Sequence, residues 1–503
     1  MTKSLVQKSF ARFSRLPLKW YLLLIILLAV SLRALTLTKA GIWHDEGYSA
    51  TIISFSPSEI IGHTMRDFHP PLYVLTLRWW SLLFGSSEFA LRGMSLLFGV
   101  ATVLLVYFIV KRLRFGENTA RLATLFAAVA PFLIRYSQEA RMYGMAAFLA
   151  CAATLSLLIA LDWTQKPFAK QLKWWLIYGL LMAAAIYTHY YTAFIVFVHI
   201  GYSWYRLGGF KKLITNKAWW AGNLLAASLF SLWIPTAIAQ FSRVQQGYWI
   251  APVNGETIPN TIMQFLAFAS NELNSALEFL IATALACIVT ALMIKTSKNK
   301  RAQVWFVVAW LLVPLLITLL ISIVRQPVYY DRYFIYSAVA FSVLLAILVT
   351  HNRWRPTVKL ALTAGVVALA LFGVNNVSKS ANHQMQVVAS VVNNNIQADD
   401  LIISGELYTY FDFSYYNKTG KTVHLLSKDD LIPTGESSLI YAKRAEIVFH
   451  SLHDINQTAA KRVWLIGKTG QHDYNNQLVP DNWQLISQIE AGDSAARLFV
   501  INR

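Results

Sequence analysis

The chain contains few cysteines and few charged residues. Only Cys151 and Cys287 occur among its 503 residues, and both fall within apolar stretches, so neither a disulfide framework nor a cysteine-based metal site is available. Charged residues make up 14% of the sequence, whereas 56% of the residues are hydrophobic and 17 are Trp. This composition is far from that of a soluble domain and indicates a membrane protein.

Long apolar stretches account for most of the chain up to residue 377. A helix needs about 17 to 25 mostly apolar residues to cross roughly 30 Å of hydrocarbon. Eleven such spans are predicted, at 19–38, 91–110, 120–134, 143–161, 174–188, 192–208, 219–239, 275–294, 303–324, 333–350 and 358–376. The expected fold class is mainly α, a polytopic transmembrane helical bundle over residues 1–377.

Acidic residues are scarce compared with basic ones, 25 against 44, which gives a formal net charge of +19. Most of the Lys and Arg fall in alternate loops, and these loops are cytoplasmic if the N-terminus lies inside. The excess positive charge is therefore a topology signal, and nucleic acid is not an expected partner. The basic N-terminal run precedes a long apolar stretch with no small-residue cleavage site before Trp43, which predicts a retained signal anchor in the cell membrane.

The composition changes from residue 378. Short runs at 401–404, 438–442 and 462–467 predict strands, and 380–396 is helix-like, so residues 378–503 are expected to form a compact α/β domain. An odd number of spans places this domain outside the cytoplasm. Its acids, such as Asp399, Asp400, Asp429 and Asp430, have turn-like positions and are interpreted as solvated loop residues.

The sequence WHDEGYS at 43–49 follows the first span and predicts an outer loop that carries Asp45 and Glu46 side by side. Adjacent carboxylates at the mouth of an apolar protein can act as a base, hold a metal ion or orient an acceptor, because burial and nearby charge shift their pKa values. The plainer interpretation is a solvated loop with two ordinary acids.

The same outer loop continues to His69, which precedes Pro70 and Pro71. The two prolines stiffen the chain and would hold His69 in a defined direction, although a lone histidine is more often structural than catalytic. Residues 77–85, LRWWSLLFG, predict an aromatic amphipathic helix in the membrane interface or a short re-entrant packing helix.

Further charged residues fall on the other outer loops. Arg135, Glu139 and Arg141 belong to RYSQEARMYG at 135–144, where cations close to the headgroups could hold a phosphate. The loop at 188–192 reads THYYT. Arg325, Arg332 and Tyr333 belong to RQPVYYDRY at 325–333, on the same side as Asp45. Plain anchoring by an interfacial belt explains these arginines and tyrosines equally well.

Several motifs together resemble a known family. WHDEGYS, HPPLY at 69–73, SEFALR at 87–92 and YSQEARMYG at 136–144 are similar to the bacterial relatives of protein O-mannosyltransferases and lipid A aminoarabinose transferases. Those proteins belong to the GT-C superfamily of integral membrane glycosyltransferases. The resemblance covers roughly residues 15–240, and beyond 240 only the Arg332–Tyr333 pair is similar.

The resemblance implies transfer of a sugar from a polyprenyl-phosphate carrier to an acceptor hydroxyl on a protein, lipid or glycan, outside the cytoplasm. Asp45 matches the catalytic aspartate of the family, and Glu46 matches its acidic neighbour, for which acceptor positioning and metal contact are both open. The expected substrate-binding residues are His69, Arg135, Glu139, Arg141, Arg325, Arg332 and Tyr333. The aminoarabinose branch carries Lys where His69 stands, a departure that bears on the phosphate role of His69. No cofactor is specified, and a divalent cation remains an open expectation.

Two other classes of protein compete with the enzyme. A lipid-linked sugar transporter, or flippase, would place ionisable residues near the bilayer midplane and show internal repeats. Here Arg33 and Arg92 fall near the outer ends of their spans, His199 is the clearest deep ionisable residue, and no repeat of motifs is visible. A sensor that is anchored by its spans would not need charged motifs on four outer loops.

Overall fold

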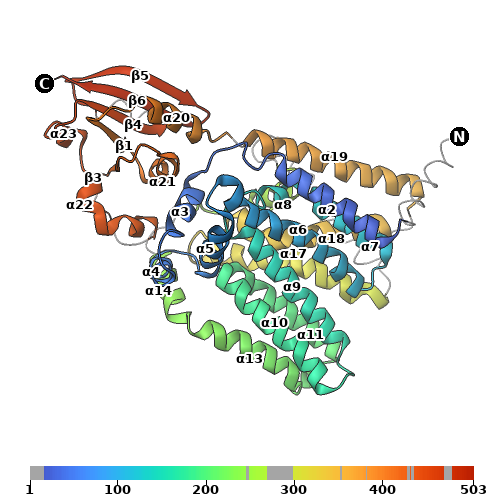
Figure 1. Cartoon of the computed structure of the whole chain (residues 1–503). Helices are drawn as coiled ribbons and strands as arrows, with labels where there is room; N and C mark the ends of the chain where they lie inside the picture. The colour runs from blue at the N-terminus through green and yellow to red at the C-terminus, as the bar shows by residue number, and fades with distance from the viewer. Residues whose placement is uncertain are drawn as a thin grey trace. The chain divides into compact units, whose positions relative to one another are not determined.

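The structure is a computed structural model that describes residues 16–244, 249–268, 298–351, 354–380, 382–427, 431, 435–469 and 479–502. The chain divides into two compact units. The helical unit comprises Met1–Thr36 and Arg92–Ser378, and the mixed unit comprises Leu37–Leu91 and Lys379–Arg503. The segment that contains WHDEGYS thus packs in one unit with the C-terminal residues (Figure 1).

The helical unit consists of helices joined by short turns. The described helices are α2 (Leu18–Ala34), α6 (Glu88–Arg112, which begins in the mixed unit), α7 (Glu117–Val129), α8 (Pro131–Arg135), α9 (Tyr143–Asp162), α10 (Phe168–Thr188), η1 (Tyr190–Ala193), α11 (Phe194–Leu207), α12 (Phe210–Ile214), α13 (Lys217–Ser231), α14 (Ile234–Val244), α15 (Thr257–Ala267), α17 (Lys298–Val324), η2 (Asp331–Phe334), α18 (Ile335–His351) and α19 (Pro356–Ser380).

Five of the described helices are long and apolar enough to cross a membrane: α6, α9, α17, α18 with its preceding turn, and α19. They coincide with five of the predicted spans, and the bent pair α13 and α14, which meet at 64°, makes a sixth if counted as one span. The window at 120–134 is broken where Pro131 starts α8, because proline cannot continue the hydrogen bonding of α7. The window at 275–294 lies outside the described residues, and the total of eleven spans stays a prediction.

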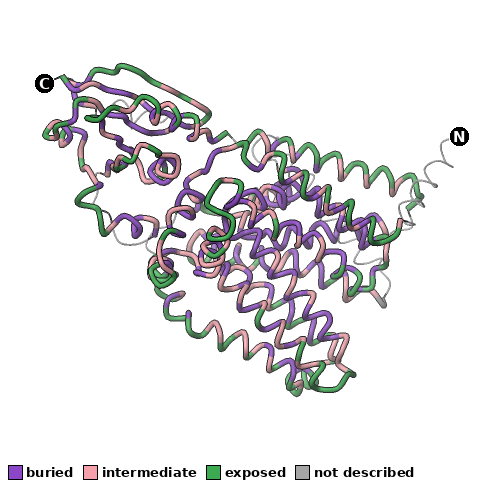
Figure 2. The backbone as a smooth tube through the Cα atoms, in the orientation of Figure 1, coloured by how far each residue is buried: buried purple, intermediate pink, exposed green. Residues whose placement is uncertain are grey.

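Burial differs strongly among these helices. In the most apolar window of α18, 94% of the residues are buried inside the protein, against 11% for α19, whose surface is largely exposed in Figure 2. Close packing of α10 on α13 depends on two glycines, since a Cβ added at Gly179 would lie 2.3 Å from the carbonyl oxygen of Gly222. Small residues at such contacts let membrane helices approach closely.

The mixed unit is built around a six-stranded sheet in the order β3-β2-β1-β4-β6-β5. Its strands are β1 (Asp400–Ser404), β2 (Val423–Leu426), β3 (Val448–Phe449), β4 (Arg462–Lys468), β5 (Trp483–Ala491) and β6 (Ser494–Ile501). Its helical elements are α3 (His44–Ile52), α4 (Pro57–Arg66), α5 (Leu72–Phe84), α20 (Met385–Asn395), α21 (Leu407–Tyr416), η3 (Gly435–Leu439), η4 (Tyr441–Lys443), α22 (Arg444–Ile447) and α23 (Leu452–Ile455).

The predicted α/β character of the C-terminal residues agrees with these elements in most places. The runs at 401–404 and 462–467 are strands, 380–396 contains α20, and 77–85 falls mainly within α5. The predicted strand at 438–442 is wrong, because η3 and η4 occupy it and Ile440 is its single β-branched residue. Asp399 is exposed as expected, but Asp400 is buried and accepts hydrogen bonds from Arg462 (2.7 Å) and Trp464 (3.1 Å), while Asp429 and Asp430 lie outside the described residues.

The parallel strands of the sheet bring their carboxyl ends to the same end of the sheet. Strands β3, β2, β1 and β4 run parallel, and β6 and β5 are antiparallel additions. From β1 the chain first extends the sheet on one side with β2 and β3, then returns to the other side with β4. In open α/β sheets, ligands bind beyond the carboxyl ends of the strands at such a reversal of strand order.

Candidate functional site

Asp45 and Glu46 lie on the first turn of helix α3, so the prediction that they lie on a loop is wrong. Trp43 is the N-cap residue of α3. The Glu46 carboxylate, at the third helical position, accepts a hydrogen bond from the backbone N–H of Trp43 at 3.4 Å. Acidic side chains stabilise the first turn because the positive end of the helix dipole lies there. Glutamate three positions after the cap was the sequence signal for this helix.

Helix α3 packs directly on helix α21. A Cβ at Gly47 would lie 2.7 Å from the backbone carbon of Phe411, so only glycine permits this separation of the two helices. The ring of Tyr48 meets the ring of Phe411 edge to face, with centroids 5.9 Å apart. As a result Glu46 is fully buried, whereas Asp45 is half-buried.

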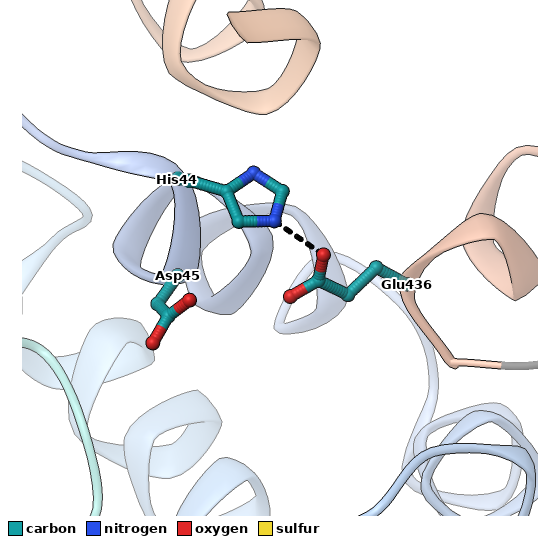
Figure 3. A group of neighbouring side chains, drawn as sticks. All are labelled: His44, Asp45 and Glu436. Atoms are coloured by element: carbon teal, nitrogen blue, oxygen red, sulfur yellow. Dashed lines mark hydrogen bonds and ion pairs between the residues drawn. The ribbon is translucent and has the colours of Figure 1, made fainter. Parts of the chain in front are cut away.

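Asp45 belongs to a cluster with His44 and Glu436, the acid cluster of this protein (Figure 3). One ligand atom from each residue lies within 4.8 Å of the others. In Figure 3 the imidazole of His44 faces the Glu436 carboxylate, and its Nε2 atom is bonded to that carboxylate. Burial alone would lower the pKa of His44, but the hydrogen bond and charge of Glu436 raise it above its ordinary value, with help from Asp45 and Asp412.

Sequence reasoning missed two of these three residues. His44 was visible as the residue before the acidic pair, but a histidine inside an apolar motif has an unremarkable structural interpretation. Glu436 is 392 positions away from His44 and carries no motif of its own. Only the packing of α3 against the C-terminal residues reveals the partnership.

Polar groups surround the acid cluster at the carboxyl ends of β1, β2 and β4. Glu406 and Tyr408 follow β1, Glu436 follows β2, and Lys468 ends β4, with its Nζ atom 5.6 Å from the Tyr408 ring centre. Burial raises the pKa of Glu406. Burial also raises the pKa of Asp412, although His383 acts in the opposite direction. The cluster therefore lies where the strand order of the sheet reverses.

His69 lies half-buried in the turn between α4 and α5. The turn is joined to α3, because the Tyr48 hydroxyl donates a hydrogen bond to Asp67 at 3.1 Å. Leu72 begins α5 directly after Pro71, which is the N-cap residue. The two prolines thus fix the start of α5, in keeping with the stiffening expected from the sequence.

In the helical unit, three predicted motifs meet in a second cluster, the arginine–tyrosine cluster: Arg141, Tyr143, His189, Arg332 and Tyr333. The guanidinium of Arg332 lies over the rings of Tyr330 (4.7 Å) and Tyr143 (5.6 Å). Tyr333 stacks on Tyr143 at 6.4 Å and lies 4.9 Å from His189. Arg141 and Arg332 both act electrostatically on His189, so two positive charges converge on one buried aromatic region.

Two other predicted arginines have different surroundings. Arg135 forms an ion pair with the buried Glu139 at 2.8 Å, so its charge is balanced within the protein. Arg325 is exposed just beyond the end of α17 and lines a cavity of about 160 Å³ with Phe241, Val244, Ile321, Gln326 and Val328.

The two clusters offer different chemistry. The acid cluster holds carboxylates and an imidazole, which can accept a proton from a hydroxyl or bind a cation. The arginine–tyrosine cluster holds guanidinium groups, which match the shape and charge of a phosphate.

Comparison with known proteins extends this description. Residues 68–235 match the sequence profile of the family described as dolichyl-phosphate-mannose-protein mannosyltransferase. The structure is similar to ArnT from Cupriavidus metallidurans in the apo state (TM-score 0.61, 11% identity, covering 95% of this chain and 98% of that chain). ArnT bound to undecaprenyl phosphate gives the same TM-score at 12% identity, covering 96% of this chain and 98% of that chain.

A more distant similarity is to the Archaeoglobus fulgidus oligosaccharyltransferase tethered with an acceptor peptide, with a TM-score of 0.50 and 13% identity, covering 89% of this chain and 68% of that chain. No curated protein matches the chain. The helical composition, the membrane-spanning helices and the family match agree with one another. The chain is a multi-pass membrane protein with the GT-C fold.

Proposed function

We propose that the protein transfers a sugar from a polyprenyl-phosphate carrier to an acceptor hydroxyl on the outer face of the cytoplasmic membrane, with Asp45 as the general base. The observation that carries this proposal is the placement of Asp45 in a chain with the GT-C fold. Its half-buried carboxylate lies on the first turn of α3, and that turn is held in place by the glycine contact with α21.

The reaction asks little of the protein beyond a base and positive charge. The acceptor oxygen attacks the anomeric carbon, the bond from that carbon to the phosphate oxygen breaks, and the acceptor proton passes to Asp45. Polyprenyl phosphate leaves with the electron pair. A positioned base contributes typically 10² to 10⁴ in rate, and cations at the departing phosphate stabilise its developing charge.

Arg141 and Arg332 are the proposed phosphate contacts. Arg141 is buried, and Arg332 is held among aromatic rings, so both side chains are oriented before a ligand binds. The structure of ArnT with undecaprenyl phosphate supports a lipid phosphate as the carrier. Tyr333 shapes this region, and Arg135 with Glu139 supports it as an ion pair. His69 and Arg325 are proposed as further contacts of the donor phosphate.

Glu46 is proposed to position Asp45 and, through it, the acceptor. The Glu46 carboxylate caps α3 from inside the protein. Removing it would loosen the first turn of α3, on which Asp45 is carried.

The alternative is a flippase that moves the same lipid-linked sugar without transferring it. The deep ionisable residue that this alternative needs, His199, is buried and bonded to Thr154 (3.0 Å) and Tyr178 (3.3 Å). Hydrogen bonds to two uncharged hydroxyl groups fit a histidine that joins neighbouring helices. This observation favours the enzyme.

Mass spectrometry of envelope lipids, glycans and proteins from cells with and without the gene tests the proposal. We expect loss of one hexose, pentose or uronic acid from a single acceptor class, together with accumulation of the polyprenyl-phosphate sugar. Proteoliposomes with purified protein and a labelled lipid-linked sugar separate the two alternatives. Lipid movement without release of the sugar from its carrier would establish the flippase and overturn the proposal.

A further inference from the structure

We propose that the surface between helices α11 and α17 of the helical unit binds one anionic phospholipid, with the lipid phosphate at Arg301. A cavity of about 550 Å³ lies between the two helices, and each of them contributes to its walls. This volume is within the range of about 300–1,000 Å³ that is usual for ligand pockets. Among the described residues that line the cavity, Arg301 is the charged one, and the others are apolar or aromatic.

Arg301 lies at one end of this cavity. The two helices run in opposite directions, since Tyr202 in the second half of α11 packs on Phe306 near the start of α17, with ring centres 4.4 Å apart. From Arg301 to Val313, the lining residue furthest along α17, the helix rises about 18 Å. Half of the hydrocarbon region is about 15 Å thick. The cavity therefore has the depth of one leaflet, which suits the chain of a phospholipid.

The walls of the cavity belong to a surface that contacts lipid. Phe197, Tyr205 and Trp305 are exposed, although α17 is long and apolar enough to cross a membrane. Within the hydrocarbon region there is no water to solvate such a surface. No described atom lies within 4 Å of a Cβ added at Gly201, so the α11 wall leaves room for a hydrocarbon chain.

The charges at the same end of the helical unit favour an anion. Arg206 of α11 is balanced by Asp162 at 2.8 Å. Arg301, in contrast, is exposed, and among the described residues no carboxylate forms an ion pair with it. Lys211 and Lys212 of α12, which packs next to α11, are also exposed. Basic pockets between membrane helices bind the headgroups of anionic lipids, whereas a zwitterionic lipid would bring a further cation to this place.

The polyprenyl carrier proposed as the sugar donor does not suit this cavity. Its phosphate is proposed to contact Arg332, which follows the other end of α17. Helix α17 has 27 residues and is about 40 Å long, so a phosphate at Arg301 belongs to the opposite headgroup region. In the orientation proposed for the chain, this is the cytoplasmic leaflet. Lipid binding at Arg301 does not depend on sugar transfer, so either proposal can fail alone.

Native mass spectrometry of the full-length protein, purified in detergent and stripped of lipid, tests the proposal. The protein is titrated with dioleoyl phosphatidylglycerol and, separately, with dioleoyl phosphatidylcholine. We expect one tight site per chain that prefers phosphatidylglycerol about fivefold, the effect of one basic group at the headgroup. Arg301→Gln should abolish this preference. Arg355→Gln, which removes an exposed arginine just before α19, should retain it.

Gly201→Leu tests the cavity itself. It should lower the affinity for both lipids about tenfold, because the added side chain occupies the space of the lipid chain. Gly365→Leu in α19 is the matched control, since no described atom lies within 4 Å of its Cβ position either, and it should bind both lipids as the wild type does. If Gly201→Leu aggregates, Ala309→Leu in the α17 wall replaces it with the same expected result.

Four results would overturn the proposal. They are equal binding of the two lipids by the wild type, an unchanged preference in folded Arg301→Gln, unchanged affinity in the folded cavity variant, and displacement of phosphatidylglycerol by an equal concentration of undecaprenyl phosphate. The last result would make the cavity a site for the carrier lipid.

Discussion

At the scale of single residues, the arginines predicted to contact phosphate differ in how their charge is used. Arg135 is neutralised by the buried Glu139, and Arg325 is exposed beyond α17. Arg141 and Arg332 instead act together on His189 among aromatic rings. A positive charge held in a buried region acts more strongly on an anion than one in water, because the local dielectric constant is lower.

Arg141→Ala should therefore weaken donor binding. We expect KM for the polyprenyl-phosphate sugar to rise about tenfold or more, and kcat to fall as well, since a phosphate contact acts both before and during bond cleavage. Steady-state transfer at varied donor concentration measures both constants. Arg355→Ala, which removes an exposed arginine, is the control. Equal KM values for the two variants would remove Arg141 from the phosphate site.

Sequence patterns located some of these residues and not others, for physical reasons. Asp45 and Glu46 were found because they are adjacent and follow an apolar span. No motif links His44 to Glu436, since that pairing depends on packing between distant segments. Arg325 and Arg332 were grouped because they share one motif. In the structure Arg325 follows the end of α17 and Arg332 belongs to the turn η2, so their surroundings differ.

At the scale of elements, α3 illustrates why a helix can be predicted as a loop. It has nine residues, among them Gly47, and an isolated helix of that length is unstable in water. Packing on α21 stabilises it, and Gly47 permits that packing. The spans and the main strands were predictable because long apolar runs and β-branched runs determine them locally.

Gly47→Ala should destabilise the protein by about 1–3 kcal/mol, since the added Cβ would meet the backbone of Phe411 at 2.7 Å. This loss exceeds the gain of up to about 1 kcal/mol that alanine brings within a helix. Gly62→Ala in α4 is the matched control, because nothing lies within 4 Å of its Cβ position. Thermal unfolding in detergent compares the two. A higher unfolding temperature for Gly47→Ala would contradict the packing argument.

A second feature at this scale is the ion group centred on His383. The buried His383 pairs with the buried Asp412 of α21 and with the partly exposed Asp493 in the turn between β5 and β6. Burial alone would lower the pKa of His383, but the two carboxylates raise it to about 9. A raised pKa in the folded state means that the stabilisation is fully present below about pH 6.5 and is lost as the pH rises through 9.

The difference in unfolding temperature between the wild type and His383→Gln should therefore be large at pH 6 and shrink between pH 6.5 and pH 9. Removing one member of a buried charge group typically costs about 3–5 kcal/mol at the pH where the group is charged. Thermal unfolding of both proteins from pH 6 to pH 10 measures this difference. A difference that stays constant over this range would show that His383 acts through packing and not through its charge.

At the scale of the whole molecule, the proposed reaction requires a defined orientation in the membrane. Basic residues are concentrated in the loops expected to be cytoplasmic, and the proposed orientation has the N-terminus inside and the C-terminal domain outside. The mixed unit contains both the WHDEGYS segment and the C-terminal residues, so one orientation must hold for both.

An alkaline phosphatase fusion at Arg503 should be active, and a reporter that works only in the cytoplasm should be silent at the same position. Fusions at Lys166 and Lys211, in loops expected to be cytoplasmic, should show the reverse pattern. An inactive phosphatase at Arg503 would contradict the orientation and would place Asp45 on the cytoplasmic side as well.

The most direct measurement for the general base is transfer by Asp45→Asn in proteoliposomes with a labelled polyprenyl-phosphate sugar. Asn keeps the size and polarity of Asp but cannot take the acceptor proton, so we expect transfer to fall by roughly 10² to 10⁴ while the lipid donor still binds. Asp399→Asn, which changes an exposed aspartate of the same unit, should transfer at the wild-type rate. Full transfer by folded Asp45→Asn would contradict the account.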